Sequence, residues 1–442
     1  MKKNTKPFIF VQLNEINFDL VRQYVKTRHL PAFQRLLSVF DQIETFGEDE
    51  YQNLEPWIQW VSAQTGKTFE EHGVFRLGDI VTSESMQIFE ILEQAGLKVG
   101  AISPMNARNE LRSPAFFIPD PWTETPSDPS GFSCRITAML RQTVNENATG
   151  TVSVRSKLSI IEMILRTLSF RKTLPLFRLI ARSRQRSWIR PLVLDYLIHL
   201  IHLKQFRKTH PDASFVFLNA GAHIQHHYFL NSPYSSSPLR NPSWYVPPAA
   251  DPVFDMIQAY DQMLGDYLAL ANSDVNLIVA TGLTQIAYDR VKFYYRLKNH
   301  SSFLNKVGIE HCQVLPRMTR DFEVSFTDRQ LTVRAIQILQ DMRMKHDGRH
   351  LFGEIEDRGL SLFVTLTYPD EIHSTAQVML GSGQEVSIFE EVAFVAIKNG
   401  MHSKKGFAFF PMGTVDPSMH SPIHVAGLFD LTLNMAGVEV RV

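Results

Sequence analysis

Cysteine is nearly absent from this 442-residue chain, which contains only Cys134 and Cys312. The two stand far apart in the sequence and belong to no Cys-x-x-Cys or Cys/His zinc pattern. A fold held together by disulfides is therefore excluded, and a reducing compartment is expected.

Long apolar runs are absent as well. No window of about 20 apolar residues occurs, so we expect no transmembrane span. The first apolar run, Phe8 to Leu13, soon gives way to the polar residues Asn14 and Glu15. Such a run is too short for a signal peptide. We therefore expect a cytoplasmic protein, with at most peripheral contact with the inner membrane.

The chain also lacks an excess of charge of either sign. Lys and Arg number 45, as do Asp and Glu, so the formal net charge is zero. Bulk charge gives no reason to expect a nucleic-acid partner, and none is predicted. With 44% hydrophobic and 20% charged residues, the composition is typical of a globular protein. The length allows about two to three domains, or one large domain with insertions.

What the chain does have is an alternation of strand-like and helix-like segments. The expected strands are Pro7 to Leu13, Lys98 to Ser103, Ser214 to Asn219, Asn276 to Ala280, Ser361 to Thr367, Val392 to Ile397 and Phe407 to Phe410. The expected helices are Phe18 to Thr27, Ala32 to Phe40, Ser83 to Gln94, Asp251 to Ala271 and Ile423 to Met435. This alternation predicts an α/β fold, with a mostly parallel central sheet and helices on both faces.

One segment breaks the alternation. Residues 155–208 contain thirteen Lys and Arg but only two Asp and Glu, and apolar residues recur there at helical spacing. We expect a basic helical insertion at 151–210 between two parts of the core, 1–150 and 211–442, with a cap within 286–360. Two interpretations of its charge stay open. It is either a solvated surface, or a cationic face that docks on an anionic membrane or a polyanionic substrate.

Polar residues follow several of the expected strands, where a parallel sheet gathers its ligands. Glu15 follows the first strand and is placed for metal ligation or acid–base chemistry, although a polar helix-capping turn is the alternative. Thr281 and Gln285 follow the strand that ends at Ala280. His402 stands just before the strand that begins at Phe407.

Three histidines, His223, His226 and His227, follow the strand that ends at Asn219. A single histidine is most often structural, but three within five residues at a strand end favour binding of metal or phosphate.

Two tryptophans lie on one side of a helix expected to begin at Pro56. Trp57 and Trp60 are spaced to share a face, and Glu55 and Gln59 stand beside them in the sequence. Indole rings stack on sugar rings or nucleobases, while carboxylates and amides hydrogen-bond hydroxyl groups. The alternative is that the tryptophans belong to the core.

In this order of features the chain resembles the alkaline phosphatase superfamily, in particular its type I phosphodiesterase/nucleotide pyrophosphatase branch. Thr65-Gly66 followed by His72-Gly73 is the clearest match. The resemblance covers most of the chain outside the basic segment and part of 286–360. It implies an alkaline-phosphatase-like core and, in an intact member, transfer of phosphoryl or sulfuryl groups at two metal ions.

Most of the family's functional positions carry other residues here. The first metal-binding Asp falls on Asn14, with Glu15 next to it, and the nucleophile falls near Glu55-Pro56, which has no hydroxyl or thiol. The Asp-His pair of the Ser-Asp-His-Gly signature falls on Thr281-Gly282. One metal site of the family has therefore lost its ligands.

The other metal site is partly preserved. The Asp of the family's Asp-x-x-x-His loop falls on Ala222, but its His is His226, and the late His is His402. We therefore expect His226 and His402, with a carboxylate, to hold one divalent metal, zinc or manganese.

Three functions are compatible with these departures. The first is a divergent hydrolase or transferase that acts on a phosphate- or sugar-containing substrate, such as a bacterial surface-glycan or glycolipid intermediate. The second is an inactive binding or scaffold protein, and the third an intact metallohydrolase with unusual ligands. The expected catalytic residues are Glu15, Glu55, His223 and His227, converging with the metal ligands on one pocket. The expected substrate-binding residues are Asn14, Trp57, Gln59, Trp60 and Gln285.

Overall fold

The computed structural model describes residues 6–149, 170–272, 274–317, 320–416 and 422–439. These residues form two compact units. The first takes the described parts of 1–144, 152–287 and 400–442, and the second those of 145–151 and 288–399.

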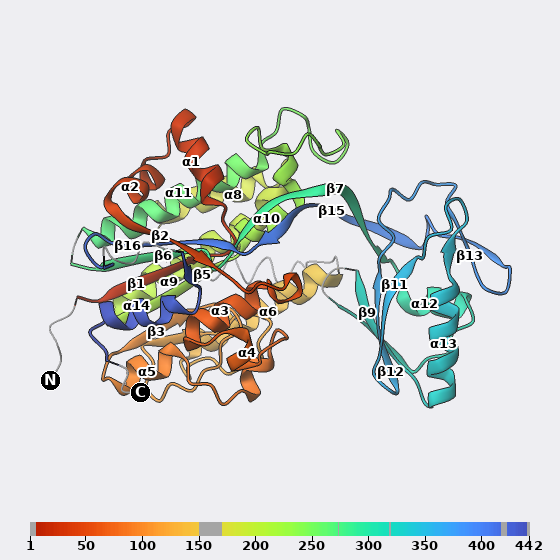
Figure 1. The fold of residues 1–442 in the computed structure, drawn as a ribbon, viewed down its shortest axis with the longest axis horizontal. Coiled ribbons are helices and arrows are strands. Elements are labelled where there is room, and N and C mark those ends of the chain that lie inside the picture. Colours follow the sequence, from red (N-terminus) through yellow and green to blue (C-terminus); the bar gives the residue numbers. More distant parts are fainter. Residues whose placement is uncertain (1–5, 150–169, 273, 318–319, 417–421, 440–442) are drawn as a thin grey trace. The chain divides into compact units, whose positions relative to one another are not determined.

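The first unit is built on an eight-stranded sheet with the order β17-β2-β16-β6-β1-β5-β3-β4 (Figure 1). Its strands are β1 (Phe8–Leu13), β2 (Phe40–Phe46), β3 (Val99–Ile102), β4 (Phe116–Ile118), β5 (Ala213–Leu218), β6 (Asn276–Ala280), β16 (Lys405–Pro411) and β17 (Ile423–His424). Central strand β1 pairs in parallel with both β5 and β6, whereas β16 is antiparallel to β2 and β6. The predicted mostly parallel α/β sheet is thus confirmed.

Helices cover both faces of this sheet. They are α1 (Phe18–Thr27), α2 (Pro31–Val39), α3 (Pro56–Thr65), α4 (Phe69–His72), α5 (Ile88–Gln94), α6 (Gly131–Thr149), α8 (Phe170–Arg182), α9 (Arg190–Thr209), α10 (Ala220–Tyr228), α11 (Pro252–Ala271) and α14 (Gly427–Met435). Successive strand residues point to opposite faces. Ile9 and Val11 accordingly join the core under α1, α2, α9 and α11, while Phe8 and Phe10 join the core under α3, α5 and α14.

Three local expectations were wrong. The expected helix Ile423 to Met435 begins instead as the short strand β17, and α14 starts only at Gly427. The expected helix Ser83 to Gln94 starts at Ile88, because Gln87 and Glu90 form a capping box there. The expected strand Val392 to Ile397 continues to Ser403, since it forms the long ribbon strand β15.

The described part of the basic segment, residues 170–208, shares the core of the first unit. Helix α9 buries most of its apolar side chains against the sheet and α11. Arg182 and Arg186 donate hydrogen bonds to the Asp255 carboxylate at 2.6 and 2.9 Å, and the Trp188 indole donates to it at 2.8 Å. These two arginines therefore neutralise a buried acid of α11. Residues 155–169 lie outside the described part of the chain.

The second unit is mainly antiparallel. Its elements are α12 (His300–Lys306), β8 (Gln313–Pro316), β9 (Asp321–Ser325), α13 (Arg329–Asp341), β10 (Arg343–Met344), β11 (Phe352–Asp357), β12 (Ser361–Leu366), β13 (Gln377–Met379) and β14 (Glu385–Ser387). The chain leaves the first unit along β7 (Thr284–Leu297) and returns along β15 (Val392–Ser403), and these two strands pair. Among the described helices, none has the length and apolarity needed to cross a membrane.

A buried histidine of α9 gives the fold a pH dependence. His202 is fully buried, with Nε2 at 2.8 Å from Ser214 Oγ and Nδ1 at 3.2 Å from the Tyr267 hydroxyl. Burial, with a smaller contribution from His199, lowers the pKa of His202 to about 3. In the unfolded chain this imidazole is protonated below its ordinary pKa of 6.5, whereas in the folded protein it stays neutral down to about pH 3.

We expect the free energy of unfolding to fall as the pH drops from 6.5 toward 3, by up to about 1.4 kcal/mol per pH unit from this residue. Urea denaturation at pH 7 and pH 5 should show a smaller loss for His202→Gln than for the wild type, because glutamine takes no proton. Equal losses for the two proteins would rule His202 out as the source.

Candidate functional site

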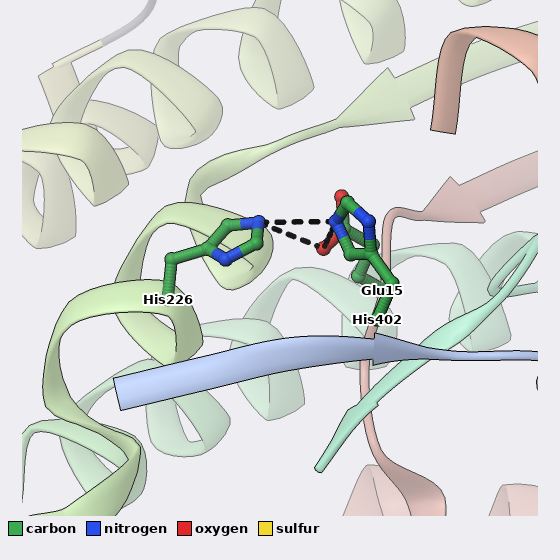
Figure 2. A group of neighbouring side chains, drawn as sticks. All are labelled: Glu15, His226 and His402. Atoms are coloured by element: carbon green, nitrogen blue, oxygen red, sulfur yellow. Dashed lines mark hydrogen bonds and ion pairs between the residues drawn. The ribbon is translucent and has the colours of Figure 1, made fainter. Parts of the chain in front are cut away.

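Glu15, His226 and His402 point at one another (Figure 2). Glu15 Oε2 lies 3.2 Å from His226 Nε2 and 3.2 Å from His402 Nε2. The two imidazole nitrogens lie 3.3 Å from each other. In the part of the chain that the structure describes, this is the one group of three or more acidic, histidine or cysteine side chains arranged to hold a metal ion.

Glu15 reaches this place through an unusual backbone conformation. It lies in the turn after β1 and has a φ of 62°, in the left-handed region that residues other than glycine seldom adopt. Its N–H donates to Thr281 O at 3.0 Å, and its carbonyl accepts from Gln225 Nε2 at 2.8 Å. Backbone strain of this kind costs about 1–3 kcal/mol and is concentrated at functional sites.

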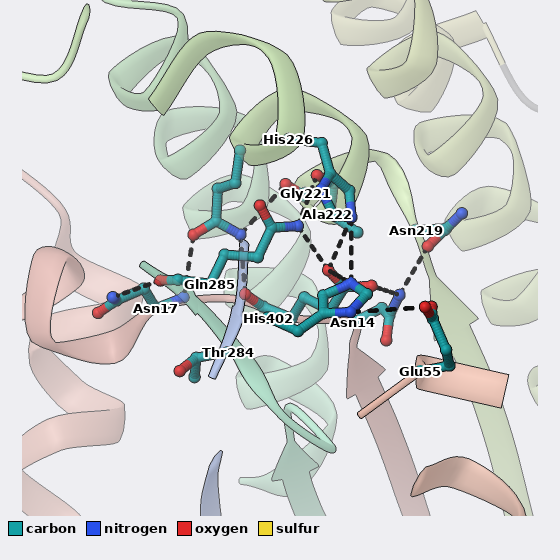
Figure 3. Close-up of polar contacts among 12 residues, drawn as sticks. Asn14, Asn17, Glu55, Asn219, Gly221, Ala222, His226, Thr284, Gln285 and His402 are labelled. Carbon is teal, nitrogen blue, oxygen red and sulfur yellow. Dashed lines mark hydrogen bonds and ion pairs between the residues drawn. The ribbon is translucent and has the colours of Figure 1, made fainter. Parts of the chain in front are cut away.

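Two amides hold the Glu15 carboxylate. Asn14 Nδ2 donates to Oε1 at 3.0 Å, and Gln285 Nε2 donates to Oε2 in a short hydrogen bond (Figure 3). Gln285 is fully buried. A β-carbon at Gly400 would overlap the Gln285 Oε1, so only glycine fits beside it in β15. Asn14 and Gln285, both expected to bind substrate, therefore position Glu15.

The histidines keep Glu15 ionised. Burial alone would raise the pKa of this carboxyl, which is 1% exposed. The nearby imidazoles of His402 and His226 outweigh the burial and hold the pKa well below its ordinary value. The site therefore presents a buried anion in contact with two imidazole nitrogens.

Glu55 lies at the edge of the cluster. It precedes α3 as its N-cap residue, and its carbonyl accepts from the N–H groups of Ile58 and Gln59. Its side chain is 33% exposed, and Oε2 lies 3.7 Å from His402 Nδ1, on the side of the ring opposite Glu15. Glu55 thus combines access to solvent with proximity to the cluster.

The two other histidines of α10 are not part of the cluster. His223 is exposed, and its ring contacts that of His227 with centroids 4.8 Å apart. The centroids of His227 and His226 are 6.3 Å apart. His223 and His227, four residues apart on the helix, thus contact each other, and neither belongs to the group formed by Glu15, His226 and His402. Of the residues expected to converge, Glu15, Glu55, His226 and His402 lie together, whereas His223 and His227 are not members of the group.

The prediction that Trp57, Gln59 and Trp60 bind a substrate is wrong for Gln59 and Trp60. Trp60 has no exposed surface and packs in the core, and its indole N–H donates to Asn14 Oδ1 at 2.8 Å. Gln59 is equally buried, with Nε2 donating to Asn53 O. Neither can contact a substrate. Trp57 is partly exposed, and its Nε1 donates to Phe75 O at 3.0 Å.

The three nitrogen and oxygen atoms of the cluster fit a small tetrahedral ion. Zinc bonds to nitrogen and oxygen are about 2.0–2.2 Å long, so neighbouring ligand atoms of a tetrahedron are roughly 3.4 Å apart. The observed separations of 3.2, 3.2 and 3.3 Å are close to that value. Two imidazoles and one carboxylate are also a common ligand set of catalytic zinc sites, which keep a fourth position open. The residues therefore fit one divalent metal.

Asn14, Thr281 and Gly282, the positions expected to lack metal ligands, are engaged in packing and hydrogen bonds. Gly282 lies against Trp60, so that a β-carbon there would stand 3.0 Å from the indole. Thr281 Oγ1 accepts from the Phe407 N–H at 2.9 Å. Asn14 is held by the Trp60 indole. Packing against Trp60 and these hydrogen bonds therefore occupy the three positions.

Sequence reasoning missed Asn219 and Gln225. Asn219 follows the last residue of β5, a position that could have identified it. Its Oδ1 accepts from Asn14 Nδ2 at 2.8 Å. Gln225 carried no signal, because a buried glutamine in a helix is recognisable only once its partners, Glu15 and Asn17, are known.

No model of a protein family matches the sequence, and neither does any curated protein. Among solved structures, phosphonoacetate hydrolase from Sinorhizobium meliloti is similar, with 12% identity over 98% of this chain and 96% of that chain and a TM-score of 0.42. Human ectonucleotide pyrophosphatase/phosphodiesterase 5 is 10% identical over 99% and 96%, with a TM-score of 0.43. The alkaline phosphatase PafA is 9% identical over 99% and 97%, with a TM-score of 0.46. The similarity to these structures is one of fold.

Elemental analysis of the purified protein tests the cluster. We expect about one equivalent of a divalent metal per chain after zinc loading and dialysis. Glu15→Gln, His226→Ala and His402→Ala should each lose most of it, because each removes one of three ligands. His373→Ala, which removes an exposed histidine of the second unit, is the matched control and should retain the metal. Full retention by all three site variants would contradict the assignment.

Proposed function

We propose that the protein is a hydrolase or transferase that acts on a phosphate-containing substrate with one divalent metal held by Glu15, His226 and His402. The observation that carries this proposal is the triangle of 3.2, 3.2 and 3.3 Å formed by Glu15 Oε2 and the two Nε2 atoms. Zinc is the ion whose geometry this triangle matches best, and manganese is the second choice.

A divalent metal in this place supplies Lewis-acid polarisation of a phosphoryl oxygen and lowers the pKa of water bound beside it. The chain itself supplies the fixed ligands. Asn14 and Gln285 each donate to the Glu15 carboxylate and prevent it from rotating away. Hydrogen bonds around a ligand of this kind typically change metal affinity by about 10–100-fold.

Glu55 is the residue best placed to move a proton. Its carboxylate is partly exposed, stands 3.7 Å from the outer nitrogen of His402, and occupies the position where the resembling family has its nucleophile. We propose that it removes a proton from the attacking water or alcohol, or returns one to the leaving group. Such help is worth about 10²–10⁴-fold in rate.

The substrate that we propose is defined by its phosphate group. A sugar ring was expected from Trp57, Trp60 and Gln59, and two of these are buried. Metal polarisation and a carboxylate base are instead suited to a phosphate ester. A glycan- or lipid-linked phosphate is retained in the proposal as one substrate class, alongside small phosphorylated molecules.

Steady-state kinetics tests the role of Glu55. The zinc-loaded wild type should hydrolyse or transfer from at least one member of a panel of phosphate mono- and diesters, sugar phosphates and nucleotide sugars. Glu55→Gln should lower kcat by about 10²–10⁴-fold, because the amide neither accepts nor returns the proton. Its metal content should be unchanged, because Glu55 is not one of the three ligands. Glu50→Gln, at an exposed position, is the control and should be as active as the wild type.

Two results would contradict this account. Full activity of Glu55→Gln would show that Glu55 transfers no proton in the reaction, but it would not contradict the metal site. A metal-loaded wild type that turns over nothing on the panel, yet binds phosphate compounds, would indicate a binding protein on the same fold.

A further inference from the structure

We propose that Asn219 is a substrate-binding residue of this site, whose side-chain Nδ2 donates a hydrogen bond to an anionic oxygen of the substrate. In the function proposed above, on which this inference rests, that oxygen belongs to the phosphoryl group.

A chain of hydrogen bonds fixes which way the Asn219 amide faces. The Trp60 indole can only donate, so the atom of Asn14 that it meets at 2.8 Å must be the oxygen Oδ1. Asn14 Nδ2 is then directed toward Glu15 Oε1 at 3.0 Å and Asn219 Oδ1 at 2.8 Å. The acceptor end of Asn219 is thereby committed to Asn14, and its Nδ2 must face the other way.

The last donor in this series of hydrogen bonds is Asn219 Nδ2. Figure 3 shows this nitrogen directed away from Asn14. Among the described residues, none accepts a hydrogen bond from it, although Asn219 is only partly exposed. A half-buried amide donor at the carboxyl end of a central strand, beside a metal-ligand cluster, is a natural partner for an anionic oxygen.

Asn219 is close enough to the metal ligands to share a substrate with them. Its Oδ1 and Glu15 Oε1 accept from the same nitrogen at 2.8 and 3.0 Å, so these two oxygens are no more than roughly 6 Å apart. The Asn219 side chain is therefore separated from the Glu15 carboxylate only by the Asn14 amide that both accept from.

The backbone of Asn219 is anchored independently. Its N–H donates to Asp195 Oδ1 at 3.2 Å, and the N–H of Ala220 donates to Asp195 Oδ2 at 2.8 Å. Asp195 is buried in α9 and also accepts from the Tyr260 hydroxyl at 2.6 Å. With both its backbone and its Oδ1 held, the amide is oriented before any ligand arrives, which is what makes such donors effective.

Calorimetric titration of inorganic phosphate into the zinc-loaded protein tests the inference without an assay of activity. Asn219→Ala should weaken phosphate binding by about 10- to 100-fold, the usual effect of one hydrogen bond to a charged group. Asn219→Asp should weaken it further, because a carboxylate oxygen then faces the anion while the bond from Asn14 is retained. Zinc content, measured in parallel, should be unchanged in Asn219→Ala. Asn272→Ala, an exposed asparagine at the end of α11, should bind phosphate as the wild type does.

The outcomes separate this inference from the proposed function. Phosphate binding by Asn219→Ala as tight as in the wild type would overturn the role of Asn219 and leave the metal site intact. Loss of zinc from Asn219→Ala would also overturn it, because the residue would then be supporting the ligands. A wild type that holds zinc but binds no phosphate, or holds no zinc at all, would overturn the proposed function and this inference together.

Discussion

The site depends on one buried negative charge, the carboxylate of Glu15. Removing a carboxylate from water costs several kcal/mol unless charge and hydrogen bonds compensate it. Here the backbone of the same residue is also strained, with its φ of 62°. Asn14 and Gln285 donate to the two oxygens, Thr281 and Gln225 hold the main chain, and two imidazoles approach from the open side. A divalent cation between these imidazoles and the carboxylate would balance the buried charge.

The residues around Glu15 form one connected support. Asn14, its neighbour in the sequence, donates to its carboxylate, which also lies against His226 and His402. Trp60 fills the space beside Gly282 and uses its indole N–H to orient Asn14. Trp60 and Asn14 thus support Glu15, and Asn14 also holds Asn219.

Much of this arrangement could be predicted from the sequence, because hydrophobic alternation and strand ends are local signals. The strands around Phe10, Phe215 and Ile278 were placed in one sheet, and the pairing of His226 with His402 followed from the resemblance. Trp60 and Gln59 were wrongly predicted to bind substrate. Spacing along a helix shows which side chains share a face, but it does not show whether α14 and the sheet cover that face. The roles of Asn219 and Gln225 could not be predicted, since they depend on contacts between residues more than 200 positions apart.

X-ray absorption spectroscopy of the zinc-loaded protein tests the central claim most directly, because it reports the ligands of the metal itself. The account predicts two imidazole nitrogens and one or two oxygens at about 2.0–2.2 Å, with no sulfur ligand. It also predicts no second metal in the outer shell. A metal–metal distance of about 3.5–4 Å, typical of two-metal sites, or a spectrum without imidazole would contradict it.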